Sequence, residues 1–334
     1  MMASKAKISL FSILLAVLLA VLVGCGVTEE GNEGKESTNE PADKSEETQE
    51  ETSGDSFPMT VEDGSGEQVE IEAEPETIVS VQASNTEIAF ALGQGEKMIG
   101  VSDYCNYPAE TEDIEKVGGQ EMNVEKILSL MPDMVLVTTF HHENHAAVLE
   151  QFEEAGIDVV VVDDANSFDA VYDNIQLVGK ATGSSDEATA LIEDMETRLA
   201  DVKEKAQQVE EKKKVWVEVA PAPDIFTTGS GTFMHEMLEA INAENAAKEE
   251  EGWVKFTEEE AVNLDPEVII TTYGYYVDNP ENQVLEREGW SEVPAVEDEQ
   301  VFDVDNDTVT RPGPRLIDGV ERLGELIYPE VFSE

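Results

Sequence analysis

Short apolar runs alternate with helical patterns from residue 57 to the end of the chain. Runs with the length of a buried strand occur at 77–81, 98–102, 134–138 and 158–162, and again at 215–219, 268–272 and 301–304. Such runs, separated by segments of helix length, are typical of an α/β fold with mostly parallel strands. Because the runs fall into two sets, the pattern predicts two sheets.

Helical periodicity is clearest between the two sets of strands. At 168–182 and again after Gly183, apolar side chains recur every three or four residues and form one face. Ser84 followed by Glu87 has the spacing of a capping box and predicts a helix over 86–92. A last helix is predicted over 316–327.

An internal repeat supports two related lobes. Residues 123–138 align without gaps to residues 257–272, and each copy reads as an N-cap, a short amphipathic helix, a Pro–acid turn and a buried strand. Asn123 and Thr257 suit N-caps. Glu125 and Glu259 fall in the first helical turns, where the helix dipole favours negative charge.

The amino terminus has the pattern of an export signal. Lys5 and Lys7 precede an apolar run at 8–23, which is shorter than the about 20 residues of a spanning helix. The run closes in Leu-Val-Gly-Cys, which resembles the lipobox of bacterial lipoproteins. That resemblance implies cleavage after residue 24 and a diacylglyceryl group on Cys25; a membrane anchor helix is the alternative.

A polar segment and a single remaining thiol follow. Residues 25–56 hold 11 acidic and 2 basic side chains with almost no apolar ones, which predicts a disordered acidic tether. With Cys25 lipidated, Cys105 is the only thiol left. A disulfide framework and a cysteine zinc site are therefore excluded.

The chain is strongly acidic, with 75 acidic and 20 basic side chains and a formal net charge of −55. Nucleic-acid binding needs cations that displace counterions from phosphates, so that role is excluded, as is docking through a basic face onto anionic lipid. Residues 57–334 alone hold 64 acidic and 16 basic side chains. Such self-repulsion requires screening, which indicates a saline medium.

No catalytic set assembles from the motifs. A G-x-S-x-G elbow and a P-loop are both missing from the sequence. Asp303, Asp305 and Asp307 alternate like the start of a calcium loop, but the sixth and twelfth positions are Thr308 and Pro314, which rejects an EF-hand. The sequence therefore predicts no catalytic residue and no resident cofactor.

Three histidines follow a strand end. His141 and His145 are four apart, so on a helix they would share a face and could bind a divalent metal. The alternative for them and His142 is a polar loop and helix start. Because no third ligand is evident nearby, no metal site is predicted, and a metal-dependent extracytoplasmic enzyme is kept as the competing function.

Aromatic side chains gather at the predicted strand ends, a position where α/β sheets bind ligands. They are Tyr104, Tyr107, Phe140, Trp253, Tyr273, Tyr275 and Tyr276. Such a set suits a flat, largely apolar ligand fixed by a few polar groups. Arg311 and Arg315 bracket a nearby turn, where a guanidinium could face a ligand carboxylate or form a structural salt bridge.

Several motifs, in order, resemble those of one family. They are Ser84-Asn-Thr-Glu-Ile-Ala-Phe-Ala-Leu-Gly, Gly100-Val-Ser-Asp-Tyr-Cys-Asn-Tyr-Pro, Val117-Gly-Gly, Pro132-Asp and Thr310-Arg-Pro-Gly-Pro-Arg. Over residues 57–330 the chain resembles the iron-complex and cobalamin substrate-binding proteins of ABC importers. The resemblance implies two Rossmann-like lobes, at 57–167 and 184–334, joined by one long helix at 168–183, as in class III periplasmic binding proteins.

The resemblance also implies functional residues and partners. Glu125 and Glu259 would dock to the transmembrane permease subunits, which work with an ATPase. Cleft residues carry over onto Tyr104, Trp253 and Asp307. Phe140, His141, Tyr273 and Arg311 complete the set of expected ligand contacts.

The expected ligand is cobalamin, held by a monomeric lipoprotein on the extracytoplasmic face of the cell membrane. Gln120 and Thr138 stand where some cobalamin binders have tryptophan. A ferric siderophore or haem therefore stays open as the bound solute.

If the acidic surface is adapted to salt, the melting temperature should rise as salt is added. We expect a continuous increase between about 0.1 and 2 M salt, because the screening length falls to about 3 Å at 1 M. Differential scanning calorimetry measures it, and an unchanged melting temperature over this range would contradict the interpretation.

Overall fold

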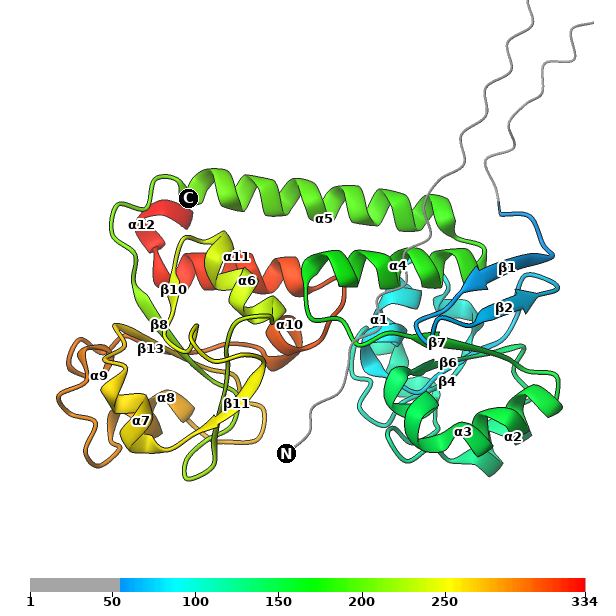
Figure 1. The fold of residues 1–334 in the computed structure, drawn as a ribbon, viewed down its shortest axis with the longest axis horizontal. Coiled ribbons are helices and arrows are strands. Elements are labelled where there is room, and N and C mark those ends of the chain that lie inside the picture. Colours follow the sequence, from blue (N-terminus) through cyan, green and yellow to red (C-terminus); the bar gives the residue numbers. More distant parts are fainter. Residues whose placement is uncertain (1–54, 334) are drawn as a thin grey trace, which may run out of the picture. The chain divides into compact units, whose positions relative to one another are not determined.

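Two separate parallel sheets form the framework of the molecule, as the computed structural model shows for the residues it describes, 55–333 (Figure 1). Cys25 and most of the predicted tether lie outside the described residues. The prediction of an α/β fold with two sheets is confirmed. No helix among the described residues is long and apolar enough to cross a membrane.

The first sheet has five parallel strands. In spatial order they are β5 (Glu115–Lys116), β4 (Met98–Val101), β3 (Ile78–Ser80), β6 (Met134–Thr138) and β7 (Asp158–Val162). If β3, β4, β5, β6 and β7 are numbered 1 to 5, their spatial order is 3-2-1-4-5, which is that of a Rossmann-type sheet. In this order the direction of winding reverses between the neighbouring strands β3 and β6.

The second sheet has four parallel strands, in the order β10 (Glu244–Asn245), β8 (Lys214–Glu218), β12 (Val268–Thr271) and β13 (Val301–Asp303). Two antiparallel ribbons were not predicted from the sequence. They are β1 (Met59–Glu62) with β2 (Gln68–Ile71), and β9 (Ile225–Thr228) with β11 (Trp253–Phe256). Many of their positions are exposed or half-buried, so they lack continuous apolar runs.

Helices cover the faces of both sheets. With β1–β7, the amino-terminal half contains α1 (Ala83–Ala91), α2 (Val124–Leu130) and α3 (Thr139–Glu154), with 3-10 turns at Gly95–Lys97 and Ala109–Asp113. α4 (Phe168–Thr182) and α5 (Ser185–Ala206) follow. With β8–β13, the carboxyl-terminal half contains α6 (Phe233–Ala240), α7 (Glu258–Asn263), α8 (Pro280–Leu285), α9 (Pro294–Glu297), α10 (Asn306–Thr310), α11 (Leu316–Ile327) and α12 (Pro329–Phe332).

The two copies of the repeat fold alike. Asn123 caps α2 by accepting a hydrogen bond from the Lys126 backbone N–H (3.1 Å), and Thr257 caps α7 through the Glu260 N–H (3.3 Å). Both N-cap predictions are confirmed. Each helix is followed at once by a central strand, β6 or β12.

The acidic residue of the Pro–acid turn has the same role in both copies. The Asp133 carboxylate accepts a hydrogen bond from the Thr77 backbone N–H, next to β3 (2.8 Å), and Glu267 accepts one from Lys214 at the start of β8 (2.9 Å). β3 pairs with β6 in the first sheet, and β8 pairs with β12 in the second. The acid therefore fixes where the two central strands begin relative to each other.

One local prediction was wrong. Helix α1 begins at Ala83, its N-cap is Gln82, and no side chain caps it. The proposed capping box of Ser84 and Glu87 does not form, because both residues lie inside the helix and are buried. The Glu87 carboxylate instead pairs with arginines far along the chain.

The faces of the two sheets that lie under α4 and α5 share one apolar core. It runs from Val160 of β7 through Met195 of α5 to Val217 of β8. α4 occupies the range predicted for the joining helix and packs on α1, β1 and β7, whereas α5 packs on α4 and on α6, α11 and α12. α5, which was predicted to belong to the carboxyl-terminal lobe, thus packs on the joining helix α4 and on three helices of the carboxyl-terminal half. The lobe boundaries themselves stay a prediction.

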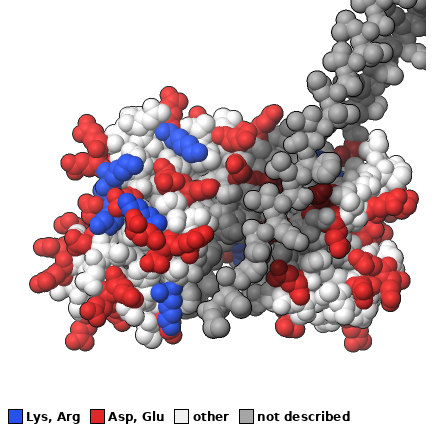
Figure 2. Space-filling model, in the orientation of Figure 1, with Lys and Arg blue, Asp and Glu red and all other residues white. Residues whose placement is uncertain are grey.

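The surface is dominated by carboxylates. Figure 2 shows acidic side chains spread over the visible face, while the few cations gather over the carboxyl-terminal half. Exposed acids at this density repel one another at low salt.

The caps of the repeat give a stability test. We expect Thr257→Ala and Asn123→Ala each to lower the free energy of unfolding by about 1 kcal/mol, because a backbone N–H at the helix start loses its acceptor. Urea unfolding followed by circular dichroism measures the change. Thr257→Ser keeps the acceptor and serves as the control; an alanine variant as stable as the serine variant would refute the capping role.

Candidate ligand-binding site

A cavity of about 580 Å³ lies where strands of both sheets end. The segment after β4 contributes one wall, and the segments after β12 and β13 contribute the other. The residues that line it are Asp103, Tyr104, Asn106, Tyr107, Tyr275, Asp305, Asn306, Asp307, Arg311 and Arg315. This is the position, outside the carboxyl ends of parallel strands, at which α/β sheets bind ligands.

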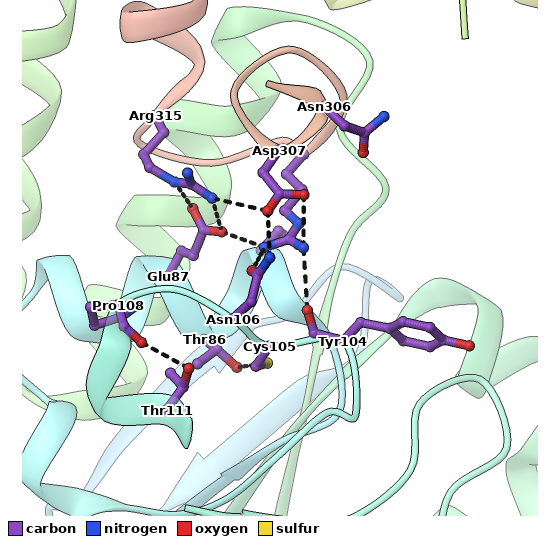
Figure 3. A network of polar contacts seen from close by, with 12 residues as sticks. Thr86, Glu87, Tyr104, Cys105, Asn106, Pro108, Thr111, Asn306, Asp307 and Arg315 are labelled. Atoms are coloured by element: carbon purple, nitrogen blue, oxygen red, sulfur yellow. Dashed lines mark hydrogen bonds and ion pairs between the residues drawn. The ribbon is translucent and has the colours of Figure 1, made fainter. Parts of the chain in front are cut away.

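A buried carboxylate joins the two walls of the cavity. Glu87 of α1, with its side chain 2% exposed, accepts hydrogen bonds from Arg311 Nη1 (2.9 Å) and from Arg315 Nε and Nη2 (2.8 and 2.7 Å). Arg311 ends α10 and Arg315 begins α11. The contact thus links the amino-terminal half to the last part of the chain (Figure 3).

Asn106 and Asp307 extend this contact toward the cavity. Arg311 forms an ion pair with Asp307 Oδ1 (2.8 Å) and donates to Asn106 Oδ1 (2.7 Å), and the Asn106 amide donates to Asp307 Oδ2 (2.8 Å). We call Glu87, Asn106, Asp307, Arg311 and Arg315 the arginine lock. It contains two acids and two cations, so it is neutral as a set.

Exposed tyrosines line the cavity together with the arginine lock. Tyr104 is 70% exposed and Tyr275 is 74% exposed. Figure 3 shows the Tyr104 ring directed away from the lock, whereas its carbonyl accepts from Arg311 (3.2 Å). Arg315 stacks on the Tyr107 ring at 4.1 Å from its centroid, a cation–π contact. The arginines therefore hold the loop that presents both amino-terminal tyrosines.

Of the expected ligand contacts, Tyr104, Asp307 and Arg311 meet at the cavity, and Phe140, His141, Trp253 and Tyr273 do not line it. The salt bridge left open for Arg311 forms within the protein. Sequence reasoning missed Glu87 as its partner and Asn106 as a bridge, since they lie more than 200 residues away.

His141 is an internal hydrogen-bonding residue. Its ring is 1% exposed, with Nδ1 2.9 Å from the Thr138 hydroxyl and Nε2 3.0 Å from the Gly119 carbonyl oxygen. Burial lowers the pKa of His141. Phe140 packs its ring edge-on against His141 and His145.

Tyr273 belongs to a buried network inside the carboxyl-terminal half. Its hydroxyl donates to Glu218 Oε2 (2.9 Å), and Arg287 grips the same carboxylate through both oxygens (2.7 and 2.9 Å). Trp216 also donates to Glu218 (3.1 Å). Burial raises the pKa of the Tyr273 hydroxyl.

Trp253 and Cys105 differ in exposure. Trp253 on β11 is partly exposed and packs against Phe233. Cys105 is buried, its thiol donates to the Thr86 hydroxyl (3.2 Å), and burial raises its pKa, which disfavours a reactive thiolate.

The two candidate docking residues are both exposed. Glu125 lies in the first turn of α2 and Glu259 in the first turn of α7. In Figure 1 these helices lie on the side of the molecule away from α5. Their docking role stays a prediction.

Residues 55–333 contain no group of three or more His, Cys, Asp or Glu side chains placed to hold a metal ion. The ring centroids of His141 and His145 lie 6.0 Å apart, and both ring nitrogens of His141 form hydrogen bonds, with Thr138 and with Gly119.

Two parallel sheets whose strand ends share a tyrosine-lined cavity define an α/β solute-binding protein. The sequence profile of the periplasmic binding protein family matches residues 78–308. The chain belongs to that family.

Relatives refine this assignment. The chain is 44% identical over 323 residues to the uncharacterized ABC transporter substrate-binding lipoprotein YvrC of Bacillus subtilis, which covers 96% of this chain and 97% of that protein. It is 26% identical over 284 residues to the cobalamin-binding protein of Halobacterium salinarum, covering 82% of this chain and 75% of that one.

A solved structure from Staphylococcus epidermidis, described as a possible iron-binding (periplasmic solute-binding) protein, is also similar. It is 30% identical with a TM-score of 0.69, covering 77% of this chain and 100% of the other. The fold is that of class III periplasmic binding proteins, as predicted. The chain is a substrate-binding protein of an ABC transporter, from the family that takes iron complexes and cobalamin.

The arginine lock should contribute strongly to stability. Glu87→Gln removes the buried carboxylate that binds both guanidinium groups and leaves two half-buried cations with Asp307 as the one remaining acid of the lock, so we expect the free energy of unfolding to fall by about 3 kcal/mol. Urea unfolding measures this loss.

Two further variants separate charge burial from packing. Glu74→Gln breaks the exposed Lys97–Glu74 pair and should cost less than about 1 kcal/mol. Combining Glu87→Leu and Asp307→Leu with Arg311→Met and Arg315→Met should regain most of the loss, since apolar replacement of a whole ion set with little exposure is often neutral. If Glu87→Gln costs no more than Glu74→Gln, the lock has no such role.

Proposed function

We propose that this protein captures cobalamin in the cavity between the ends of its two sheets and delivers it to an ABC permease. The observation that carries the proposal is the placement of exposed Tyr104, Tyr107 and Tyr275 around one cavity. Aromatic faces suit a large ligand that is flat and mostly apolar.

The relatives support the same class of ligand. The Halobacterium salinarum relative is named a cobalamin-binding protein. A ferric siderophore or haem is the second candidate, favoured by the Staphylococcus epidermidis structure, which is described as possibly binding iron and is the more identical of the two.

The proposed location and partners follow from the sequence. Cys25 would carry the lipid that anchors the protein at the extracytoplasmic face of the membrane. The relative from Bacillus subtilis is likewise named a lipoprotein. Glu125 and Glu259, exposed at equivalent positions of the repeat, would contact the permease, which acts with its ATPase. The protein would act as a monomer, without nucleic acid.

Calorimetric titration tests the ligand. We expect submicromolar binding of cyanocobalamin to the purified protein and weaker or no binding of a ferric hydroxamate and of haemin. Submicromolar binding of only the iron compounds would overturn the choice of cobalamin.

Charge reversal tests docking. Glu125→Lys with Glu259→Lys should leave the calorimetric Kd unchanged and abolish uptake of the ligand by cells, because the exposed carboxylates do not line the cavity. Glu204→Lys, at an exposed position of α5, is the matched control and should leave uptake intact. Normal uptake by the double variant would refute the docking role.

A further inference from the structure

Both arginines at the cavity already form hydrogen bonds and ion pairs with other groups of the protein. Arg311 donates to Glu87, Asn106 and the Tyr104 carbonyl, and it forms an ion pair with Asp307. A guanidinium has five N–H donors, so these contacts occupy most of its capacity.

Arg315 is held in the same way. It forms a bidentate contact with Glu87 and stacks on Tyr107, and its side chain is 14% exposed. Neither cation is therefore poised to pair with an anionic ligand.

The charged groups that line the cavity outside the lock are both carboxylates. Asp103 is exposed, and Asp305 is exposed with its closest cation, Arg315, 3.8 Å away. The described residues that line the cavity include no lysine. Because the lock is neutral as a set, Asp103 and Asp305 leave the cavity with a net negative charge.

From this balance we infer that the cavity selects by charge: it takes a ligand with flat apolar surface whose rim donates hydrogen bonds and is uncharged or cationic, and it rejects a rim of carboxylates. Asp103 and Asp305 are the specificity-determining residues, and Glu87 acts behind them by keeping both arginines occupied. The inference rests on the proposed function, since it concerns the same cavity.

Selection by charge separates the candidate ligands into those that are uncharged or cationic and those that are anionic. The rim of a corrinoid carries amides, which donate hydrogen bonds to carboxylates. The ferric complex of desferrioxamine B is cationic. Haem carries propionates and a ferric tris-catecholate is anionic, so both would meet uncompensated like charge.

A matched pair of ligands tests the inference. Cyanocobalamin is compared with its monocarboxylate, in which one side-chain amide is hydrolysed, by calorimetric titration of the whole protein. At low salt the carboxylate should bind about five- to tenfold more weakly, and the ratio should shrink as salt screens the aspartates.

Variants assign the effect to the named residues. Asp103→Asn with Asp305→Asn should bring the two affinities within about twofold, because each asparagine keeps an acceptor oxygen for the Gly118 or Asp307 backbone N–H and removes only the charge. Glu204→Gln removes an equal charge from α5 and should leave the ratio unchanged. Equal affinities in the parent protein, or an unchanged ratio in the double variant, would overturn the inference while leaving cobalamin capture intact.

A second pair of ligands tests the charge selection in case the protein does not bind cobalamin. If neither corrinoid binds, ferrioxamine B is compared with haemin. Tighter binding of ferrioxamine B would overturn cobalamin as the ligand and support the charge selection; tighter binding of haemin would overturn both.

Discussion

A single carboxylate, removed from water and held by two guanidinium groups, joins the amino-terminal half of this protein to its final helices. Glu87 could not be buried alone, because an unpaired charge in the interior costs several kcal/mol. Arg311 and Arg315 meet that requirement and at the same time orient the loop carrying Tyr104 and Tyr107. The geometry of the cavity thus depends on an ion cluster that forms part of its wall.

Glu218 is another buried carboxylate, and its contacts lie within one half of the molecule. Glu218 receives hydrogen bonds from Trp216, Tyr273 and Arg287, all in the carboxyl-terminal half. It therefore fixes strand β8 against its own surroundings and places no constraint on the other sheet. Both clusters are neutralised locally, in contrast to the surface, where acids greatly outnumber cations.

Much of the fold could be predicted because it depends on local pattern. The apolar runs predicted both ends of β6 and of β7 correctly, and the repeat located the N-caps Asn123 and Thr257. The two ribbons were missed because exposed positions interrupt their strands: β1, β2 and β11 are mostly exposed or half-buried, and exposed Phe226 interrupts β9. A continuous apolar run predicts a buried strand, and these strands have none.

The candidate site was predictable in part. Aromatic clustering indicated Tyr104, and the unusual arginine pair indicated Arg311, whereas Glu87 was assigned to a helix cap. Its spacing from Ser84 fits a cap equally well, and its true partners are 224 and 228 residues away. Pairings at that separation depend on how the sheets pack, which local spacing does not report.

The separation in sequence between Glu87 and its two arginine partners also determines when their contact can form during synthesis. Synthesis proceeds from the amino terminus, and Glu87 is made long before Arg311 and Arg315, which belong to the last 24 residues. Until those residues emerge, helix α1 carries a carboxylate whose counter-charges do not yet exist. The amino-terminal half therefore cannot reach its final packing as an independent nascent domain, and a chain truncated before Arg311 would lack both of the cations on which its own first helix depends.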